Sequence, residues 1–201
     1  IVSSGDAARA LVSVYAGQPV FHLGPERDFA LYEGLDVTLS SAADATAVSC
    51  TGLFDDEIET PADYADLLAG FAARDLPMVC ANPDLTVERG NRIIPCAGAL
   101  AAVYEQLGGR VSYAGKPYLP IYEMAFRRIE ELKGKAVDRA RILAIGDGIR
   151  TDIAGAARAG LDCVFVASGV HVEDGLTDAG LLKLFPSAES RPIAAMPALA
   201  W

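Results

Sequence analysis

Two aspartates in the second half of the chain have the type and spacing needed to bind a cation next to a phosphate. Asp147 follows the apolar run from Ile142 to Ile145 and is flanked by glycines, and Asp152 comes five residues later. The run predicts a strand buried on both faces, followed by a turn and then a helix from Thr151 onward. Both carboxylates then lie at the carboxyl end of a strand, where open α/β sheets bind ligands. Either aspartate alone has an ordinary explanation, since acids are common in turns and in the first turn of a helix, where the helix dipole favours them. The pair together predicts a Mg²⁺ site, because Mg²⁺ takes one or two carboxylates and keeps several waters.

A lysine precedes these acids in a similar setting. Lys116 lies in "YAGKPYLPIYEMAF", after an apolar strand-like run and immediately before a predicted helix. A lysine at a strand end is a compact cation that contacts both a phosphate and a neighbouring carboxylate. A surface lysine in a turn is the ordinary interpretation of any single lysine. The strand before it, the helix after it and the aspartates downstream favour the functional interpretation.

Composition narrows the possible partners. The chain has 201 residues, 52% of them hydrophobic and 22% charged, and a net charge of −10. These values predict a globular protein and argue against nucleic acid or an anionic membrane surface as partner. The four cysteines have no C-x-x-C spacing, and there is no signal peptide or long apolar span. We therefore expect buried free thiols in a cytoplasmic protein. His22 and His171 lack a metal-ligand partner at a useful spacing, so we expect them to pack in loops.

Strand-like and helix-like segments alternate along the chain, which predicts an α/β fold with parallel sheet built from βαβ units. The opening "IVSS" reads as the end of a strand, so we expect the sequence to begin inside a domain. Strands are expected over residues 19–24, 46–52, 76–84, 110–117, 142–145 and 161–169, and helices over 6–16, 25–35, 60–75, within 92–109, and over 119–134 and 173–185. The 60–75 helix should begin with Thr60 as N-cap and Pro61 in its first position.

These residues resemble the third and fourth motifs of the haloacid dehalogenase-like (HAD) superfamily. Lys116 stands at the lysine of the third motif, and Asp147 and Asp152, within "GDGIRTD", stand at the acidic pair of the fourth. The order, with "GKP" well before "GDxxxTD", is similar to subfamily IIA, the N-acetylglucosamine-phosphate phosphatase-like and pyridoxal-phosphate phosphatase-like enzymes. "CANPD", with Asn82 and Asp84, is similar to the Asn-Pro-Asp loop of their caps.

The resemblance covers nearly the whole chain and implies its organisation. A Rossmann-like core with a parallel sheet would come from residues 1–17 and 111–201, and an inserted α/β cap from residues 18–110. The implied activity is that of a Mg²⁺-dependent phosphatase acting on a small phosphorylated metabolite such as a sugar phosphate. A homodimer through the cap is the implied assembly.

The resemblance also implies a role for each candidate residue. Asp147 would bind Mg²⁺, Asp152 would bind it directly or through a water, and the catalytic Lys116 would bridge the nucleophile and the phosphate. Asn82 and Asp84 would contact the substrate. The alternative for these last two residues is an Asx turn made rigid by the proline between them.

One part of the family pattern is absent from the sequence. In such enzymes an aspartate of a D-x-D-x-[TV] motif attacks the phosphoryl group and forms an aspartyl-phosphate, and no such motif occurs here. "GLFDDE" reads as an acidic loop before Thr60, and "SSGD" reads as a segment that follows the second motif. We therefore expect the first strand and its nucleophile to lie upstream of Ile1, and the 201-residue chain alone to be inactive.

Two other functions compete with a phosphatase. A non-catalytic protein that keeps the HAD fold and binds a phosphorylated ligand is the alternative that the missing nucleophile keeps open. A dinucleotide-binding domain is disfavoured, because "GDGIRTDIAG" lacks G-x-G-x-x-G and Asp147 would repel a pyrophosphate.

Overall fold

The chain folds into two compact units. The computed structural model describes residues 1–167, 176–187 and 191–199, and the units are Ile1–Gly115 and Lys116–Trp201. The division lies close to the predicted boundary at residue 110, and it places residues 1–17 in the first unit. The identification of these two parts as cap and core stays a prediction.

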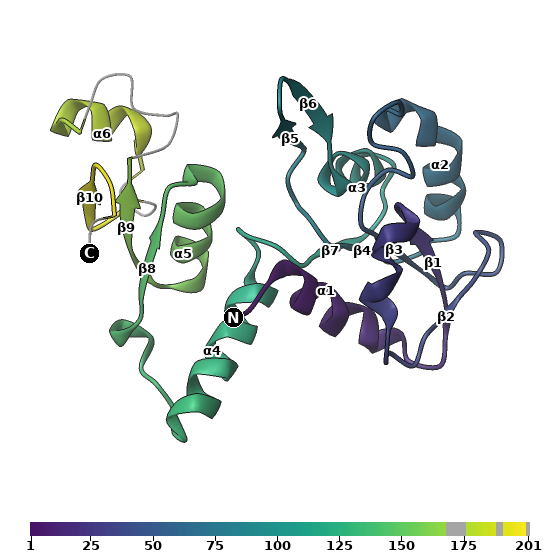
Figure 1. Cartoon of the computed structure of the whole chain (residues 1–201), viewed down its shortest axis with the longest axis horizontal. Helices are drawn as coiled ribbons and strands as arrows, with labels where there is room; N and C mark the ends of the chain where they lie inside the picture. Colours follow the sequence, from purple (N-terminus) through teal and green to yellow (C-terminus); the bar gives the residue numbers. More distant parts are fainter. Residues whose placement is uncertain (168–175, 188–190, 200–201) are drawn as a thin grey trace. The chain divides into compact units, whose positions relative to one another are not determined.

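A five-stranded parallel sheet forms the centre of the first unit (Figure 1). Its order is β2-β1-β3-β4-β7, and every neighbouring pair is parallel. The carboxyl ends of all five strands therefore meet at one edge. The strands are β1 (Pro19–Leu23), β2 (Thr38–Leu39), β3 (Ala47–Cys50), β4 (Met78–Cys80) and β7 (Val111–Tyr113).

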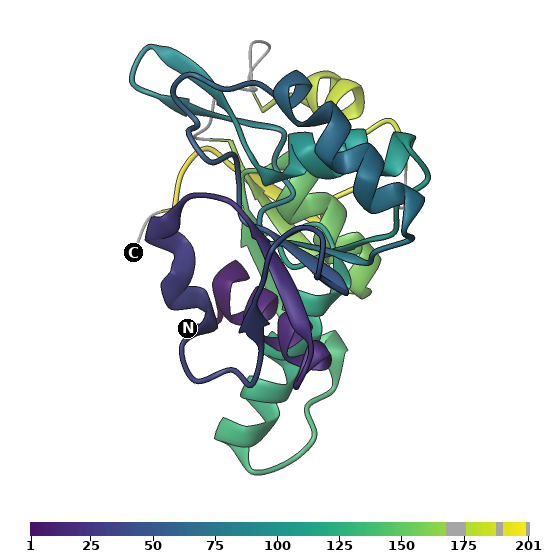
Figure 2. The same cartoon turned by 90° about the vertical axis from the view of Figure 1, so that its right-hand side faces the viewer.

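Helices cover both faces of this sheet (Figures 1 and 2). On one face are α2 (Ala65–Ala73) and α3 (Ala97–Gln106), and the ring of Phe71 in α2 lies 5.4 Å from that of Phe21 in β1. On the other face, Val12 of α1 (Ser4–Val12) clusters with Val79 of β4 and with Tyr32 of a 3₁₀ helix, η2 (Glu26–Tyr32). The sequence predicts an α-helix over 25–35, so η2 is a shorter and tighter element than expected.

Local capping sets where two of these helices begin. Thr60 forms a capping box with Asp63 ahead of the 3₁₀ turn Pro61–Tyr64, which continues into α2. This confirms the predicted start. Ser3 forms the same arrangement with Asp6 at the start of α1, so Ser3 is the N-cap and Asp6 lies in the first turn.

An antiparallel hairpin in the first unit is missing from the sequence-based expectations. It consists of β5 (Thr86–Arg89) and β6 (Arg92–Pro95), joined at Gly90, whose φ is 63°. Gly-Asn between "TVER" and "RIIP" is the local signal that would have identified it, because such dipeptides favour tight hairpin turns. The hairpin's register pairs Val87 with Ile94.

The second unit contains a three-stranded parallel sheet of order β10-β9-β8. Its described core consists of Ile153, Ala156, Cys163, Phe165 and Phe185. The strands are β8 (Leu143–Gly146), β9 (Asp162–Val166) and β10 (Ala194–Met196). The described helices are α4 (Leu119–Lys133), the 3₁₀ turn η4 (Arg139–Arg141), the π-helical turn Ile149–Ile153, α5 (Ala154–Ala159) and α6 (Asp178–Leu184).

The expectation that β8 is buried on both faces is wrong. Leu143 and Ile145 are each 49% exposed. Strand β8 lies at the edge of the described sheet, and its inward residue Ala144 packs on the core while the side chains at 143 and 145 share the other face. An apolar run of this length does not reveal whether a second layer covers it.

Other sequence-based expectations are confirmed or fall outside the described residues. All four cysteines are free and buried. His22 is buried, but it lies in strand β1 and not in a loop as predicted, and its ring bonds to Tyr32 Oη. His171 and residues 173–175 of the expected last helix lie outside the described part of the chain. None of the helices in the described residues is both long and apolar enough to cross a membrane.

Candidate active site

The carboxylate of Asp152 is bonded through both of its oxygens. Lys116 donates from Nζ to Oδ1 at 2.5 Å, and the backbone N–H of Gly148 donates to Oδ2 at 3.1 Å. The side chains of Lys116 and Asp152 are 46% and 18% exposed. Because 36 positions separate the two residues, the ion pair is a tertiary contact that ties the segment before α4 to the turn after β8.

The glycines on either side of Asp147 are needed for space. A Cβ atom on Gly146 would lie 2.4 Å from the Cβ of Asp152, and one on Gly148 would lie 2.0 Å from Thr151 Oγ1. Gly148 has an ordinary φ of −78°. Glycine is therefore needed at this position because a side chain would not fit, and not because of the backbone conformation. The chain can then fold back at once, and the backbone N–H of Asp152 donates to Gly148 O at 2.8 Å.

Asp147 itself is exposed, and its carboxylate forms no hydrogen bond or ion pair with the residues that the structure describes. Within those residues there is no group of three or more His, Cys, Asp and Glu side chains able to hold a metal. Asp147 and Asp152 would therefore supply two carboxylates at most, and water or substrate oxygens would complete the shell. Such a donor set fits Mg²⁺ and does not fit Zn²⁺, which prefers a fuller set of nitrogen and sulfur ligands.

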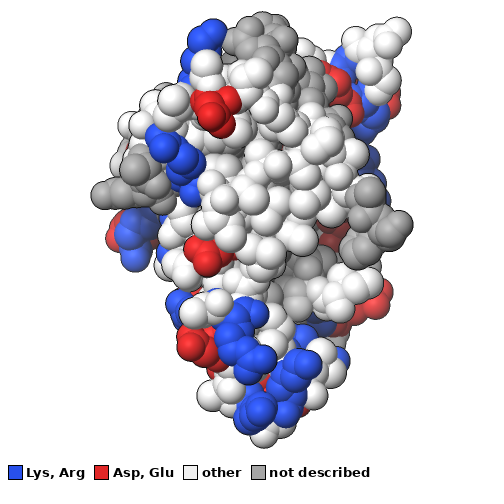
Figure 3. Space-filling model, turned by 90° about the vertical axis from the view of Figure 1, so that its left-hand side faces the viewer, with Lys and Arg blue, Asp and Glu red and all other residues white. Residues whose placement is uncertain are grey.

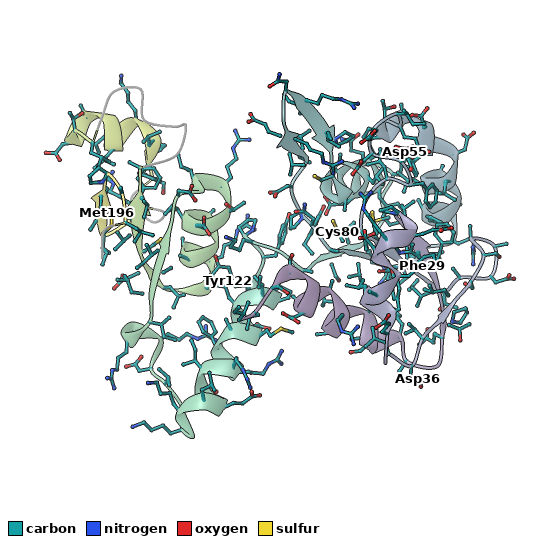
Figure 4. All side chains as sticks on the ribbon, in the orientation of Figure 1. Phe29, Asp36, Asp55, Cys80, Tyr122 and Met196 are labelled. Carbon is teal, nitrogen blue, oxygen red and sulfur yellow. The ribbon has the colours of Figure 1, made fainter. Side chains whose placement is uncertain are left out.

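Tyr122 of α4 supports the same turn and was missed at the sequence level. Its hydroxyl donates to the backbone carbonyl of Asp152 at 3.5 Å. A Cβ on Gly155 would lie 2.3 Å from this hydroxyl, so α5 can pack against Tyr122 only because it carries a glycine at this position. Figure 4 shows Tyr122 near the start of α4. Burial, with a smaller effect from Asp152, raises the pKa of Tyr122 to about 12, so it stays a donor. The small residues of "IAGAARAG" signal such a close contact.

The Asn-Pro-Asp loop belongs to the first unit, directly after β4. Asn82 Oδ1 accepts from the backbone N–H of Asp84 at 3.1 Å, which is the Asx turn. A Cβ on Gly98 would lie 2.2 Å from Pro83 O, so α3 packs tightly under this loop. Asn82 is half-buried and Asp84 is exposed. Their contact with a substrate stays a prediction.

Both acidic segments, "GLFDDE" and "SSGD", have structural roles. Asp56 of "GLFDDE" accepts from Arg27 at 2.9 Å and from both terminal nitrogens of Arg89 at 3.0 and 2.9 Å. These two guanidinium groups, Arg89 first, hold the pKa of Asp56 below its usual value. Ser3 of "SSGD" caps α1. Asp56 thus fastens the β5–β6 hairpin and is not placed as a nucleophile.

A cavity in the second unit is lined by none of the predicted site residues. It has a volume of about 640 Å³ and lies between the end of α4 and the segment that leads to β8. Lysine and arginine side chains gather over this part of the molecule, at the lower end of Figure 3. The cations that line the cavity are Lys133, Lys135 and Arg141.

The second unit thus combines a lysine–aspartate ion pair with an aspartate that has no partner among the described residues, at a strand end where α/β proteins bind ligands. Comparison with known proteins agrees. A HAD-hydrolase-like family model matches residues 113–186, which include Lys116, Asp147 and Asp152. The crystal structure of a haloacid dehalogenase-like hydrolase from Brucella suis 1330 is 50% identical, covers 99% of this chain and 72% of that one, and gives a TM-score of 0.81. The chain therefore belongs to the haloacid dehalogenase-like hydrolase family.

More distant relatives have named activities. Ribonucleotide monophosphatase NagD from Escherichia coli strain K12 is 33% identical over 115 residues, which are 57% of this chain and 42% of that protein. The chain thus spans less than half the length of this curated relative. A glycerol phosphate phosphatase from Mycobacterium tuberculosis, solved with magnesium, is 24% identical over 97% of this chain and 55% of its own, with a TM-score of 0.71. Relatives of the NagD and p-nitrophenyl phosphatase type confirm the resemblance to subfamily IIA.

Proposed function

We propose that the protein is a Mg²⁺-dependent phosphomonoesterase of the HAD type, acting on a small phosphorylated metabolite such as a sugar phosphate. The observation that carries this proposal is the Lys116–Asp152 ion pair beside the carboxylate of Asp147, which has no partner among the described residues, at the carboxyl end of β8. A purely structural ion pair would not require a second carboxylate in the same turn.

The residues of this site have separable roles. Asp147 and Asp152 would hold Mg²⁺, which supplies positive charge against the equatorial phosphate oxygens when it is bound. Lys116 holds the Asp152 carboxylate and presents its remaining N–H donors to the phosphate. Gly148 N–H fixes the second oxygen of Asp152, so the carboxylate is oriented before any ligand arrives. Without a cation, two carboxylates and one lysine would repel a phosphate.

The proposal places the nucleophilic aspartate outside residues 1–201, on a strand of the Rossmann-like core that pairs with β8. Strand β8 has a free edge in the described sheet and ends directly before Asp147. A parallel neighbour on that edge would end beside the two acids. Residues 18–110 would then be the inserted cap, with Asn82 and Asp84 contacting the substrate. The active protein would be cytoplasmic and paired with a second copy through the cap.

A metal-binding experiment tests the site without any catalysis. Mn²⁺ added to the 201-residue chain should broaden the amide NMR signals of residues 146–152, and Mg²⁺ should compete for the same site. Asp147→Asn should abolish this broadening, whereas Asp162→Asn, an exposed acid at the start of β9, should leave it unchanged. Equal broadening in the two variants would overturn the metal assignment.

Activity tests the remainder of the proposal. Asp147→Asn in the complete enzyme should lower the hydrolysis of p-nitrophenyl phosphate by orders of magnitude, because positioned charge supplies most of the rate in phosphoryl transfer. The chain of residues 1–201 alone should show no turnover at saturating Mg²⁺. Robust hydrolysis by that chain would mean that its nucleophile lies within these residues.

A non-catalytic protein that binds a phosphorylated ligand is the second candidate, which the absence of D-x-D-x-[TV] from residues 1–201 keeps open. The two functions separate in the complete protein. Stoichiometric binding of a phosphate monoester with no release of inorganic phosphate would support the second candidate against the first.

A further inference from the structure

The start of α4 carries two tyrosines that contact α5, the helix that follows Asp152. Tyr118 is the N-cap residue of α4, and Tyr122 lies four positions later on the same face of the helix. Helix α4 packs against α5 (Figure 1), and Tyr122 meets it at Gly155. Tyr118 meets it at Arg158, whose guanidinium carbon lies 5.4 Å from the centre of the tyrosine ring.

The contact between Arg158 and Tyr118 joins two segments that are distant in the sequence. At this distance an aromatic ring attracts a cation over its face. Arg158 is exposed and forms no ion pair with any acid that the structure describes. A basic residue in the last turn of a helix is ordinarily explained by the helix dipole. The dipole does not account for a guanidinium group placed over a ring of another helix.

The Lys116–Asp152 ion pair depends on how firmly its two segments are held together. The side chain of Lys116 is 46% exposed and has a flexible four-carbon stem. Holding such a side chain in one geometry costs entropy, which offsets much of what an exposed ion pair gains. The Asp152 carboxylate is fixed by the Gly148 N–H, so the remaining freedom lies in the segment that carries Lys116.

We propose that Arg158 is a positioning residue for Lys116. Tyr118 is two residues from Lys116, and Arg158 belongs to the helix that begins directly after the turn containing Asp152. The cation–ring contact therefore ties the backbone beside the lysine to the element that carries its partner carboxylate. Without this contact, Lys116 bonds to Asp152 for a smaller fraction of the time. The inference rests on the proposed function only in giving the positioned ammonium group a phosphate to contact.

The test follows the ammonium protons of Lys116 by NMR in the 201-residue chain. These protons exchange with water more slowly while Nζ donates to a carboxylate, so their exchange rate measures how much of the ion pair is formed. Arg158→Met keeps much of the side chain but lacks the charge, and it should speed the exchange by about threefold or more. Arg158→Lys restores a cation over the ring and should return the rate to within about twofold of the native rate. Arg127→Met, which removes an exposed arginine of α4, is the matched control and should leave the rate unchanged.

Two results of this measurement would overturn the proposal. One is the same exchange rate in Arg158→Met as in Arg127→Met. The other is equally fast exchange in Arg158→Lys and Arg158→Met, because the loss of the charge would then not be the cause. Arg158→Gln also lacks the charge and should reproduce the fast exchange, which separates the effect of the charge from any effect of methionine on folding.

Activity of the complete enzyme provides an independent check. Arg158→Met should lower kcat for p-nitrophenyl phosphate severalfold and change KM less. In a Lys116→Ala background it should have no further effect, because a residue that acts through another contributes nothing once the other is removed. The same loss of kcat in both backgrounds would show that Arg158 does not act through Lys116. The exchange measurement involves neither a metal nor catalysis, so a failure of the phosphatase proposal would leave its result interpretable.

Discussion

The two units of the chain bury their apolar side chains to very different extents. The first unit has helices on both faces of its sheet and encloses Phe71, Tyr104 and Leu68 almost completely. In the second unit, α4 has 15 residues and none of them is buried, and the outer face of β8 is half exposed. The residues with the clearest chemistry, Lys116, Asp147 and Asp152, nevertheless lie in the second unit. Hydrogen bonds and close glycine contacts, and not deep burial, hold this site together.

This difference in burial also affects where each unit offers a surface to another polypeptide segment. Apolar side chains on both α4 and β8, such as Leu132 and Ile145, are exposed, and exposed apolar patches are where another piece of polypeptide packs. A further strand on the free edge of β8, as proposed for the core, would cover part of this exposed surface. The first unit has helices on both faces of its sheet and leaves no such face open.

The largest expected effect on stability comes from truncating a buried side chain, compared with an exposed one. Phe71→Ala removes a ring that is 2% exposed and should lower the free energy of unfolding of the first unit by about 3–5 kcal/mol. Leu132→Ala on α4, which is 72% exposed, should change stability by about 0.5 kcal/mol or less. Hydrogen exchange of the β1 and α4 amides measures each unit separately. Similar losses for both variants would contradict the comparison.

Replacing either of two helical glycines in the first unit by alanine should change the free energy of unfolding, in opposite directions for the two sites. Gly98→Ala places a Cβ 2.2 Å from Pro83 O and 2.5 Å from Asp84 O, and it should cost about 1–3 kcal/mol because backbone must move. Gly70→Ala meets no atom within 4 Å and should stabilise α2 by about 1 kcal/mol. Chemical denaturation gives both values. A neutral Gly98→Ala would mean that the Asn-Pro-Asp loop is not held by α3.

The first unit should also lose stability in mild acid. His22 bonds to Tyr32 Oη at 2.6 Å and to Pro25 O at 3.1 Å, and burial lowers its pKa from 6.5. Because the unfolded chain binds the proton more readily, stability is complete above pH 6.5 and falls as the pH drops toward the lowered pKa. The acids whose pKa is lowered, Asp6, Asp56 and Asp63, start from an ordinary value of 3.8, so their contribution is lost at a lower pH than that of His22. Unfolding measured from pH 7 to 5 checks this, and His22→Phe should remove the dependence.

The smallest expected effect lies in the second unit. Tyr122→Phe removes a hydrogen bond of 3.5 Å to Asp152 O, which is at the limit of a useful distance, and should cost about 0.5 kcal/mol or less. Mn²⁺ broadening around Asp147 should be retained in this variant. A loss of metal binding in Tyr122→Phe would instead show that the hydroxyl positions the turn.

Much of this protein is determined locally by its sequence. Capping residues such as Thr60 set where helices begin, apolar runs set where strands run, and glycines around Asp147 require a tight turn. Each of these depends on neighbours within a few positions, which is why the parallel α/β pattern and the candidate residues Lys116, Asp147 and Asp152 can be predicted from the sequence.

Only the tertiary structure decided the contacts between distant segments. It paired Lys116 with Asp152 across 36 positions, placed Arg158 over the ring of Tyr118, and left the outer face of β8 exposed where the sequence predicts burial. Such contacts depend on which layers pack together and on strand order, and no local pattern encodes either. The residue types therefore define which chemistry is available, and packing decides which of them meet.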